Sequence, residues 1–265
     1  MQNNQKNSPM VATGGPSRPV VIQQATGEER QPGKESRHHE VAAPKPKGRT
    51  ATETVNIQSW KLSFKRKNEF NKIGTWNVRS MYQGKLDIVK KEMEANNCDI
   101  VGISELKWTD KGYFRSEDFT VYYSGHESNR TRGVAIICNK MVANAVLGFN
   151  PLNDRIMTLR IQCKPINVTI VQVHAPTTAA EETEIEEFYE QLQEVTESIP
   201  SQDIVIIMGD FNAKVGSREE KPITGKFGLG DRNTSGDMLV DFCAANAFMY
   251  NEHYVQAAQQ KTLKI

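Results

Sequence analysis

From residue 72 onward, short apolar runs alternate with polar turns along the chain. Runs of this length, rich in Val and Ile, are typical of buried strands. They occupy residues 72–80, 98–105, 119–125, 132–139, 155–163, 167–176 and 203–212. Several are separated by only a few polar residues, which favours antiparallel hairpins over an all-parallel sheet.

Three further segments repeat their apolar residues at the spacing of an α-helix. They are residues 85–97, 178–199 and 235–248. The second is acidic in its first turns, which the positive end of the helix dipole favours. Because helices are interleaved with hairpins, the sequence predicts an α/β fold in which two packed sheets are flanked by helices.

Residues 1–70 lack such periodicity and are rich in Gln, Asn, Pro, Gly, Lys and Arg. We therefore expect a disordered basic arm there, followed by one domain at residues 71–265. Residues 1–72 hold 13 Lys and Arg against 6 Asp and Glu, a net charge of +7, whereas the remainder carries −6. A basic arm fits contact with nucleic acid or another anionic surface, and it fits a solvated tail equally well. The basic cluster at residues 61–70 is open to interpretation as a localisation signal, a nucleic-acid contact or a linker.

No apolar run approaches the roughly 18 residues of a membrane span, and the first residues lack the apolar stretch of a secretory signal. The four cysteines lie far apart in apolar contexts, so we expect buried thiols in a reducing compartment and no zinc site. They are Cys98, Cys138, Cys163 and Cys243. The expected location is intracellular, either nuclear or cytoplasmic, with no membrane contact. Nothing in the sequence signals an oligomer.

Polar residues follow the ends of four predicted strands. Asn77 ends the first, Glu105 the second and His174 a later one, while Asp210 and Asn212 end the last. If these strands lie side by side and point the same way, their ends meet at one edge of the sheets, where sites form in layered α/β folds. Alternation along the last strand places its Asp and Asn on one face and turns the intervening Phe into the core.

The residue types at this edge predict metal-assisted hydrolysis of a phosphodiester. Glu105 and the amide oxygen of Asn77 form an oxygen-only pair, which suits Mg²⁺ better than zinc. His174 can donate to a phosphate oxygen or act as a general acid. Asp210 can orient or activate water, and Asn212 can hold a phosphate oxygen as charge develops. Singly, each residue has an ordinary explanation as part of a solvated turn or loop, so the prediction depends on their shared position.

The stretches TWNVRS, ISELKW, VHAP and GDFNAKVG, in this order, resemble the endonuclease/exonuclease/phosphatase superfamily, which includes DNase I and the apurinic/apyrimidinic endonucleases. Together with GKFGLGDRN-SG, the fuller match is to the endonucleases of RTE-clade (BovB-like) non-LTR retrotransposons, which are LINE elements. The likeness covers about residues 72–250. It implies a four-layer, DNase I-like α/β sandwich that cleaves DNA with Mg²⁺ or Mn²⁺ near Asn77 and Glu105. It also implies a catalytic role for Asn233.

Two departures from the family pattern change what the resemblance implies. The apurinic branch and most retrotransposon members carry Tyr at the position of His174, whereas DNase I carries His. Catalysis is compatible with this change, but a preference for abasic sites is no longer implied. The family's late strands and its final Asp and His have no counterpart in residues 251–265. We therefore expect a domain that is incomplete at its C-terminal end and strongly reduced in catalysis.

Three functions follow from these observations. The first is a truncated, Mg²⁺-dependent DNA endonuclease of retrotransposon origin, which would nick DNA. The alternative is a non-catalytic remnant that binds nucleic acid or a protein partner through its basic arm, with salt-sensitive binding to DNA. The third is a phosphatase for lipid or small phosphoesters, which His174 allows. The basic arm and the retrotransposon likeness weigh against this third function.

Overall fold

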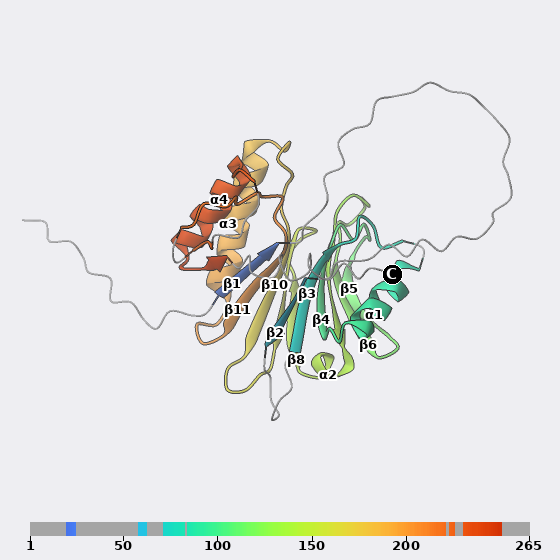
Figure 1. Cartoon of the computed structure of the whole chain (residues 1–265). Coiled ribbons are helices and arrows are strands. Elements are labelled where there is room, and N and C mark those ends of the chain that lie inside the picture. Colours follow the sequence, from blue (N-terminus) through green and yellow to red (C-terminus); the bar gives the residue numbers. More distant parts are fainter. Residues whose placement is uncertain are drawn as a thin grey trace, which may run out of the picture.

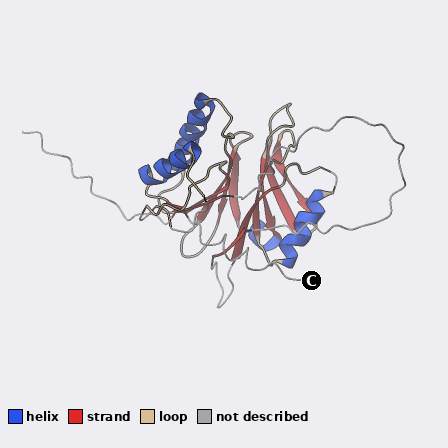
Figure 2. Ribbon diagram, turned by 45° about the horizontal axis from the view of Figure 1, so that its top comes forward, coloured by secondary structure: helices blue, strands red, loops and turns tan. Residues whose placement is uncertain are grey.

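Two six-stranded sheets lie face to face with helices on their outer sides (Figures 1 and 2). The computed structural model describes residues 20–24, 58–62, 71–82, 84–220, 223–225 and 230–250. The two sheets, called sheet A and sheet B below, hold all of the described strands outside isolated bridges.

Sheet A has the strand order β12-β1-β11-β10-β9-β8. The strands β12, β1, β11 and β10 run parallel to their neighbours, and β10, β9 and β8 pair antiparallel. Their bounds are β1 Val20–Gln24, β8 Val146–Pro151, β9 Ile156–Ile161, β10 Val168–His174, β11 Ile204–Asp210 and β12 Met249–Tyr250. The parallel pair β10 and β11 therefore ends at the same edge of the sheet.

Sheet B has the order β2-β3-β4-β7-β6-β5, in which only β3 and β4 are parallel. Its strands are β2 Gln58–Leu62, β3 Asn71–Asn77, β4 Ile100–Ser104, β5 Lys111–Ser116, β6 Phe119–Ser124 and β7 Val134–Asn139. The predicted hairpins β6–β7 and β9–β10 are confirmed as antiparallel neighbours.

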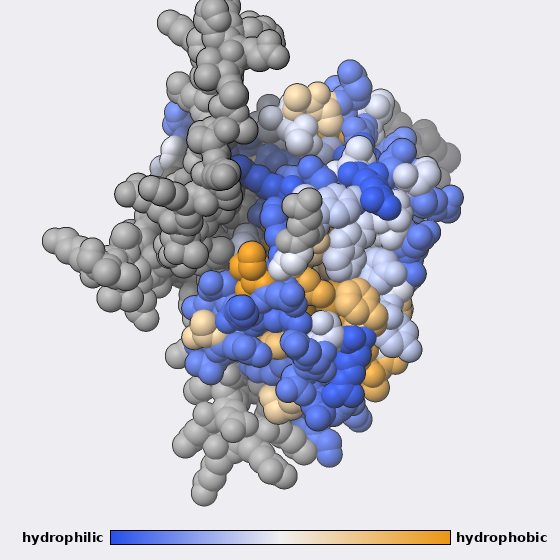
Figure 3. All heavy atoms as spheres, turned by 90° about the vertical axis from the view of Figure 1, so that its right-hand side faces the viewer, coloured by the Kyte–Doolittle hydropathy of each residue, from blue (hydrophilic) through white to orange (hydrophobic). Residues whose placement is uncertain are grey.

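Helices cover the outer face of each sheet (Figure 1). The helices α3 and α4 pack on sheet A, α1 packs on sheet B, and the short α2 follows β7. Their bounds are α1 Lys85–Ala95, α2 Lys140–Ala143, α3 Glu182–Ser198 and α4 Thr234–Ala245. Figure 3, which looks onto the side where α1 lies, shows a largely hydrophilic surface with smaller apolar areas.

Three apolar clusters hold these layers together. One joins α3 and α4 to sheet A, the second fills the space between the sheets, and the third joins α1 to sheet B. Every residue of β10 is buried because one face meets sheet B and the other meets α3. The order helix, sheet, sheet, helix confirms the predicted four-layer α/β sandwich.

Several elements were not predicted, and most of them lie at sheet edges. β2, β5, β8 and β12 are the outermost strands, and neither β5 nor β8 contains a buried residue. Edge strands can expose both faces, so they lack the apolar alternation that identifies a half-buried strand. β1 and β2 lie within residues 1–70, where the sequence analysis expects a disordered arm and predicts no strand.

The remaining predictions for the two ends of the chain fall outside the described residues. These include the basic cluster beyond residue 62 and the expected loss of the family's terminal motif in residues 251–265. The division into an arm and a domain at residue 70 therefore stays a prediction.

All four cysteines are free and buried, which confirms the prediction of small interior thiols. Burial raises the pKa of Cys98 and of Cys243 to about 12, and that of Cys163 to about 11. Thiols with such pKa values stay protonated near neutral pH and are poor metal ligands and nucleophiles. No helix among the described residues combines the length and the apolar character that crossing a membrane requires.

Candidate active site

The amide of Asn77 joins the ends of strands from both sheets. Asn77 is the last residue of β3 in sheet B, and its Nδ2 donates to Glu105 Oε1 at 2.8 Å and to Asp210 Oδ2 at 2.6 Å. Asp210 is the last residue of β11 in sheet A. The predicted convergence of Asn77, Glu105 and Asp210 at one edge is therefore present in the structure.

The side-chain oxygen of Asn77 is used within its own loop. It accepts a hydrogen bond from the backbone N–H of Arg79 at 3.0 Å. The sequence predicts this oxygen as a metal ligand beside Glu105, but in the structure the amide group holds two carboxylates near each other through its nitrogen. Two carboxylates at close range repel each other, and a shared N–H donor partly offsets that repulsion.

Glu105 occupies a tight turn directly after β4. Its φ angle is 56°, in the left-handed region that non-glycine residues rarely adopt. The backbone N–H groups of Leu106 and Lys107 donate to carbonyls of Gly133 and Arg132, which holds the turn in place. Strain of this kind occurs at functional sites when the surrounding structure fixes it. The turn directs the Glu105 carboxylate back towards Asn77.

His174 lies beside Asp210, because β10 and β11 are parallel and the two residues are paired in register. Both side chains are buried, at 7% and 6% exposure. One ligand atom each from Glu105, His174 and Asp210 lies within 4.8 Å of the others, an arrangement that can hold a metal ion. His174 Nδ1 is buried with no hydrogen-bond partner among the described residues. A buried imidazole nitrogen without a partner fits a ligand or substrate contact at this point.

The segment after Asp210 fixes the direction of its carboxylate. Phe211 is 1% exposed and packs in the cluster under α3 and α4, as predicted. Asn212 has a φ angle of 48°, and its backbone N–H donates to Asp210 Oδ1 at 3.0 Å. Its Nδ2 donates to the carbonyl of Ala175 at 2.9 Å. Asn212 therefore ties the ends of β10 and β11 together, and its predicted contact with phosphate stays a prediction.

The backbone conformation at position 209 explains why the residue before Asp210 is a glycine. Its φ angle is +147°, and a Cβ added there would lie 2.0 Å from the carbonyl oxygen of Val173 on the neighbouring strand. Only glycine allows the two backbones to approach this closely in that conformation. The approach brings the last residues of β10 and β11 together.

Asn233 has a clear structural role at the start of α4. As the N-cap residue, its side-chain oxygen accepts hydrogen bonds from the backbone N–H groups of Gly236 at 2.8 Å and Lys214 at 2.9 Å. These bonds position the helix and the segment that follows Asn212. The catalytic role that the resemblance implies for Asn233 stays a prediction.

Two arginines near His174 were missed by the sequence analysis. Arg155 donates to the backbone carbonyl of His174 at 3.0 Å and to Glu184 Oε1 at 2.6 Å. Arg132 donates to the same Glu184 oxygen at 2.8 Å. Because these residues come from three distant segments, no local pattern could have grouped them. The hydrogen bond from Arg155 lowers the pKa of Glu184, which keeps this carboxylate charged between the two cations.

The environment of His174 gives an expected pH dependence of stability. Burial lowers the pKa of His174 below its ordinary value of 6.5, although Asp210 opposes that effect. Below pH 6.5 the unfolded chain therefore takes up a proton while the folded imidazole stays neutral. The free energy of unfolding should fall as the pH drops, by up to about 1.4 kcal/mol per pH unit until the folded pKa is reached.

This pH effect can be isolated by comparing the parent with His174→Gln in EDTA. Urea unfolding at pH 8.0, 7.0, 6.0 and 5.5 should show a steeper loss of stability in the parent below pH 6.5. Above pH 7, the difference in stability between the two proteins should be constant. Parallel curves over the whole range would contradict a lowered pKa at His174.

Comparison with known proteins places the chain in a family. The Endonuclease/Exonuclease/phosphatase family profile matches residues 74–256, which is more than half of the chain. The chain therefore belongs to this family, and its fold is the family's DNase I-like sandwich. The four-residue group Asn77, Glu105, His174 and Asp210 lies within the matched region.

Two curated relatives share the name craniofacial development protein 2. The protein from Bos taurus is 47% identical over 247 residues, covering 93% of this chain and 41% of that protein. The protein from Tragulus javanicus is 52% identical over 211 residues, covering 80% of this chain and 36% of that protein. The chain thus spans about two-fifths of the length of the curated relatives it matches.

Solved structures with a looser likeness include two endonucleases. The endonuclease domain of TRAS1, a telomere-specific non-LTR retrotransposon, has 17% identity and a TM-score of 0.46, covering 66% of this chain and 69% of that one. The AP endonuclease LMAP from Leishmania major has 14% identity and a TM-score of 0.45, covering 57% and 58%. Neither likeness is strong enough to carry an argument about the chemistry of this chain.

Proposed function

We propose that this chain is a divalent-metal-dependent DNA endonuclease that hydrolyses phosphodiester bonds at the edge where β3, β4, β10 and β11 end. The observation that carries the proposal is the grouping of Glu105, His174 and Asp210 within 4.8 Å, with Asn77 bonded to both carboxylates. Asn77, His174 and Asp210 end three strands of the two sheets and Glu105 follows a fourth, and core packing alone does not require carboxylates there.

The donor atoms fit a divalent cation. Glu105 would hold Mg²⁺, or Mn²⁺ in its place, with Asp210 and His174 in reach, because hard cations prefer carboxylate oxygens. A bound cation would polarise a phosphate oxygen and lower the pKa of a nearby water. The Nδ1 of His174 is buried without a partner among the described residues, which supports a contact with a bound group such as a phosphate oxygen. Asn77 would keep the two carboxylates in place whether or not its oxygen also joins the metal.

The chain's own residues supply positioning and proton transfer. Asp210 is held by Asn77 and by the backbone of Asn212, so its orientation is fixed before substrate binds. It would orient water and accept its proton during attack on phosphorus. His174 would contact a phosphate oxygen, and Asn212 would stabilise the same group as charge develops. Arg155, which donates to the carbonyl of His174, would add positive potential next to the phosphate.

DNA from a retrotransposon context is the proposed substrate class. Support comes from the ordered motifs TWNVRS, ISELKW, VHAP and GDFNAKVG and from the basic composition of residues 1–72. The four buried free cysteines support an intracellular location, nuclear or cytoplasmic, because reducing compartments keep thiols free. An origin in an RTE-clade element belongs to the same proposal.

Nicking of supercoiled plasmid tests the proposal directly. The purified full chain should convert supercoiled to open-circular DNA with Mg²⁺ or Mn²⁺ and lose that activity in EDTA. Glu105→Gln removes one negative charge with little change of shape, so it should require more metal for half-maximal nicking. A folded sample that nicks with neither ion would contradict the proposal and favour DNA binding without catalysis. That second function would be tested by salt-dependent binding with and without residues 1–70.

A further inference from the structure

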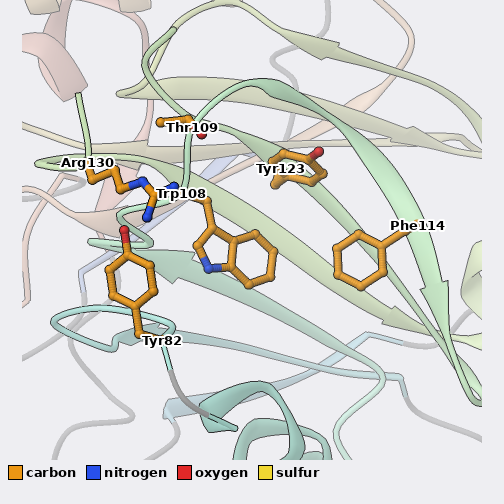
Figure 4. A pocket seen from close by; sticks show the side chains of 6 residues that line it. All are labelled: Tyr82, Trp108, Thr109, Phe114, Tyr123 and Arg130. Atoms are coloured by element: carbon orange, nitrogen blue, oxygen red, sulfur yellow. The ribbon is translucent and has the colours of Figure 1, made fainter. Parts of the chain in front are cut away.

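We propose that an aromatic pocket beside the candidate active site binds an unpaired nucleobase of the DNA substrate. This inference rests on the proposed nuclease function and names the feature of DNA that the site would recognise. The pocket has a volume of about 260 Å³ and is lined by Tyr82, Trp108, Thr109, Phe114, Tyr123 and Arg130 (Figure 4).

The aromatic rings present both faces and edges to the pocket. The Trp108 ring lies 5.6 Å from that of Tyr123 in an edge-on contact and 5.9 Å from that of Phe114. Figure 4 shows the Trp108 indole between Tyr82 and Arg130 on one side and Phe114 on the other. Phe114 and Tyr82 are each 37% exposed, so large aromatic side chains reach the surface here without being covered.

A cation at the rim adds to the attraction for a base. The Arg130 guanidinium carbon lies 5.8 Å from the centre of the Tyr82 ring. Aromatic faces combined with Arg are the means by which proteins bind unstacked bases, because every base has a π-face. The volume of about 260 Å³ is slightly below the roughly 300–1,000 Å³ of small-molecule sites, so it suits one ring system rather than a large ligand.

The pocket and the candidate active site share two loops. Tyr82 follows Asn77 after β3, and Trp108 comes three residues after Glu105. The Tyr82 hydroxyl donates to the backbone carbonyl of Lys107 at 2.6 Å, which joins the loops. Three residues of protein chain span at most about 11 Å. About the same length of one DNA strand holds roughly three nucleotides. A base in the pocket would therefore lie close to the phosphate at Glu105.

The form of the pocket also favours a base that has left the helical stack. The pocket is an open depression lined by side chains from several strands and loops, and a base that has turned out of a duplex can reach its exposed rings Tyr82 and Phe114. Extrusion costs least when the base is unpaired. The pocket would therefore direct the enzyme to DNA with a bulged or single-stranded nucleotide near the bond that is cut.

Binding measurements in EDTA test the pocket separately from cleavage. Three fluorescently labelled duplexes would be compared by anisotropy: one fully paired, one with a single unpaired nucleotide, and one in which that nucleotide lacks its base. The parent should bind the complete unpaired nucleotide roughly 5- to 150-fold more tightly than the baseless one, the range expected for stacking one base. Trp108→Ala and Phe114→Ala should largely remove this difference.

Tyr113→Ala provides the matched control. Tyr113 neighbours Phe114 on β5 but packs against Tyr122 and Phe149, with ring centroids 5.7 and 5.9 Å away, outside the pocket. This variant should keep the preference for the complete nucleotide. If Trp108→Ala fails to fold, the more exposed Phe114 and Arg130 supply the test, through Phe114→Ala and Arg130→Ala.

The outcomes separate this inference from the nuclease proposal. If the parent bound the duplexes with the complete and the baseless nucleotide equally tightly, the proposal that the pocket binds a base would be wrong, even if the same protein nicks plasmid. A preference that survives both Trp108→Ala and Phe114→Ala would also overturn it. A preference that is lost in these variants would support the pocket even if no nicking occurred, in which case only the proposal of catalysis would fail.

Discussion

Replacing Asp210 with asparagine is expected to slow metal-dependent nicking of plasmid DNA by about 10²- to 10⁴-fold. Asparagine keeps the size of the side chain, and its single amide oxygen can keep one of the two hydrogen bonds that the separate carboxylate oxygens now accept, from Asn77 at 2.6 Å and from the backbone of Asn212 at 3.0 Å. It cannot accept a proton from water. The loss should therefore fall on the rate of cleavage, with DNA binding in EDTA nearly unchanged.

Asp241→Asn is the matched control for this experiment. Asp241 is an exposed carboxylate on α4, so the variant changes the net charge equally while leaving the candidate site alone. Its nicking rate should equal that of the parent within about twofold. Equal rates for Asp210→Asn and the parent would show that Asp210 takes no part in proton transfer, and the proposed role of this residue would be abandoned.

Gly209→Ala is expected to lower the free energy of unfolding by about 3–5 kcal/mol. Two costs act together, because the alanine must adopt a φ angle of +147° and its Cβ must lie 2.0 Å from the carbonyl oxygen of Val173. The strands β10 and β11 can relieve that overlap only by separating. Urea unfolding followed by circular dichroism would measure the loss, and nicking should decline as well because Asp210 is the next residue.

The control is the same substitution at Gly148 on β8. No atom lies within 4 Å of a Cβ built there, and its φ angle is outside the left-handed region. Gly148→Ala should leave stability unchanged or raise it by up to about 1 kcal/mol. If both alanine variants were equally stable, the close approach of β10 and β11 at Gly209 would not be a constraint on the fold.

The parts of the fold that the sequence predicted are those buried on at least one face. β4, β10 and β11 are buried strands, and their sequences are recognisable as apolar runs. In α3, the helical spacing of Phe188, Leu192 and Val195 identifies the buried face. The exposed edge strands β5 and β8 carry no such pattern. β1 is held by backbone pairing to β11 and β12, and pairing of this kind depends on partners more than 180 residues away.

The candidate site was predictable where polar residues stand at the ends of apolar strands. Asn77, Glu105, His174 and Asp210 meet as expected, because the pairings β3–β4 and β10–β11 are parallel and the sheets stack. The direction of each amide was not predictable, since it depends on neighbours such as Arg79 and Ala175. The same holds for Arg132 and Arg155, which Glu184 brings together across 52 and 29 residues.

The hydrogen bond between Asn77 and Asp210 spans 133 residues of chain. At 5–20 residues per second, a ribosome needs roughly 7–27 s to make the second partner after the first. Sheet B is complete once β7 has been made, but sheet A still lacks β11, the strand between β1 and β10, so the inner apolar face of sheet B is only partly covered. The nascent chain would therefore expose apolar surface during translation, and the site would be assembled only after β11 has emerged.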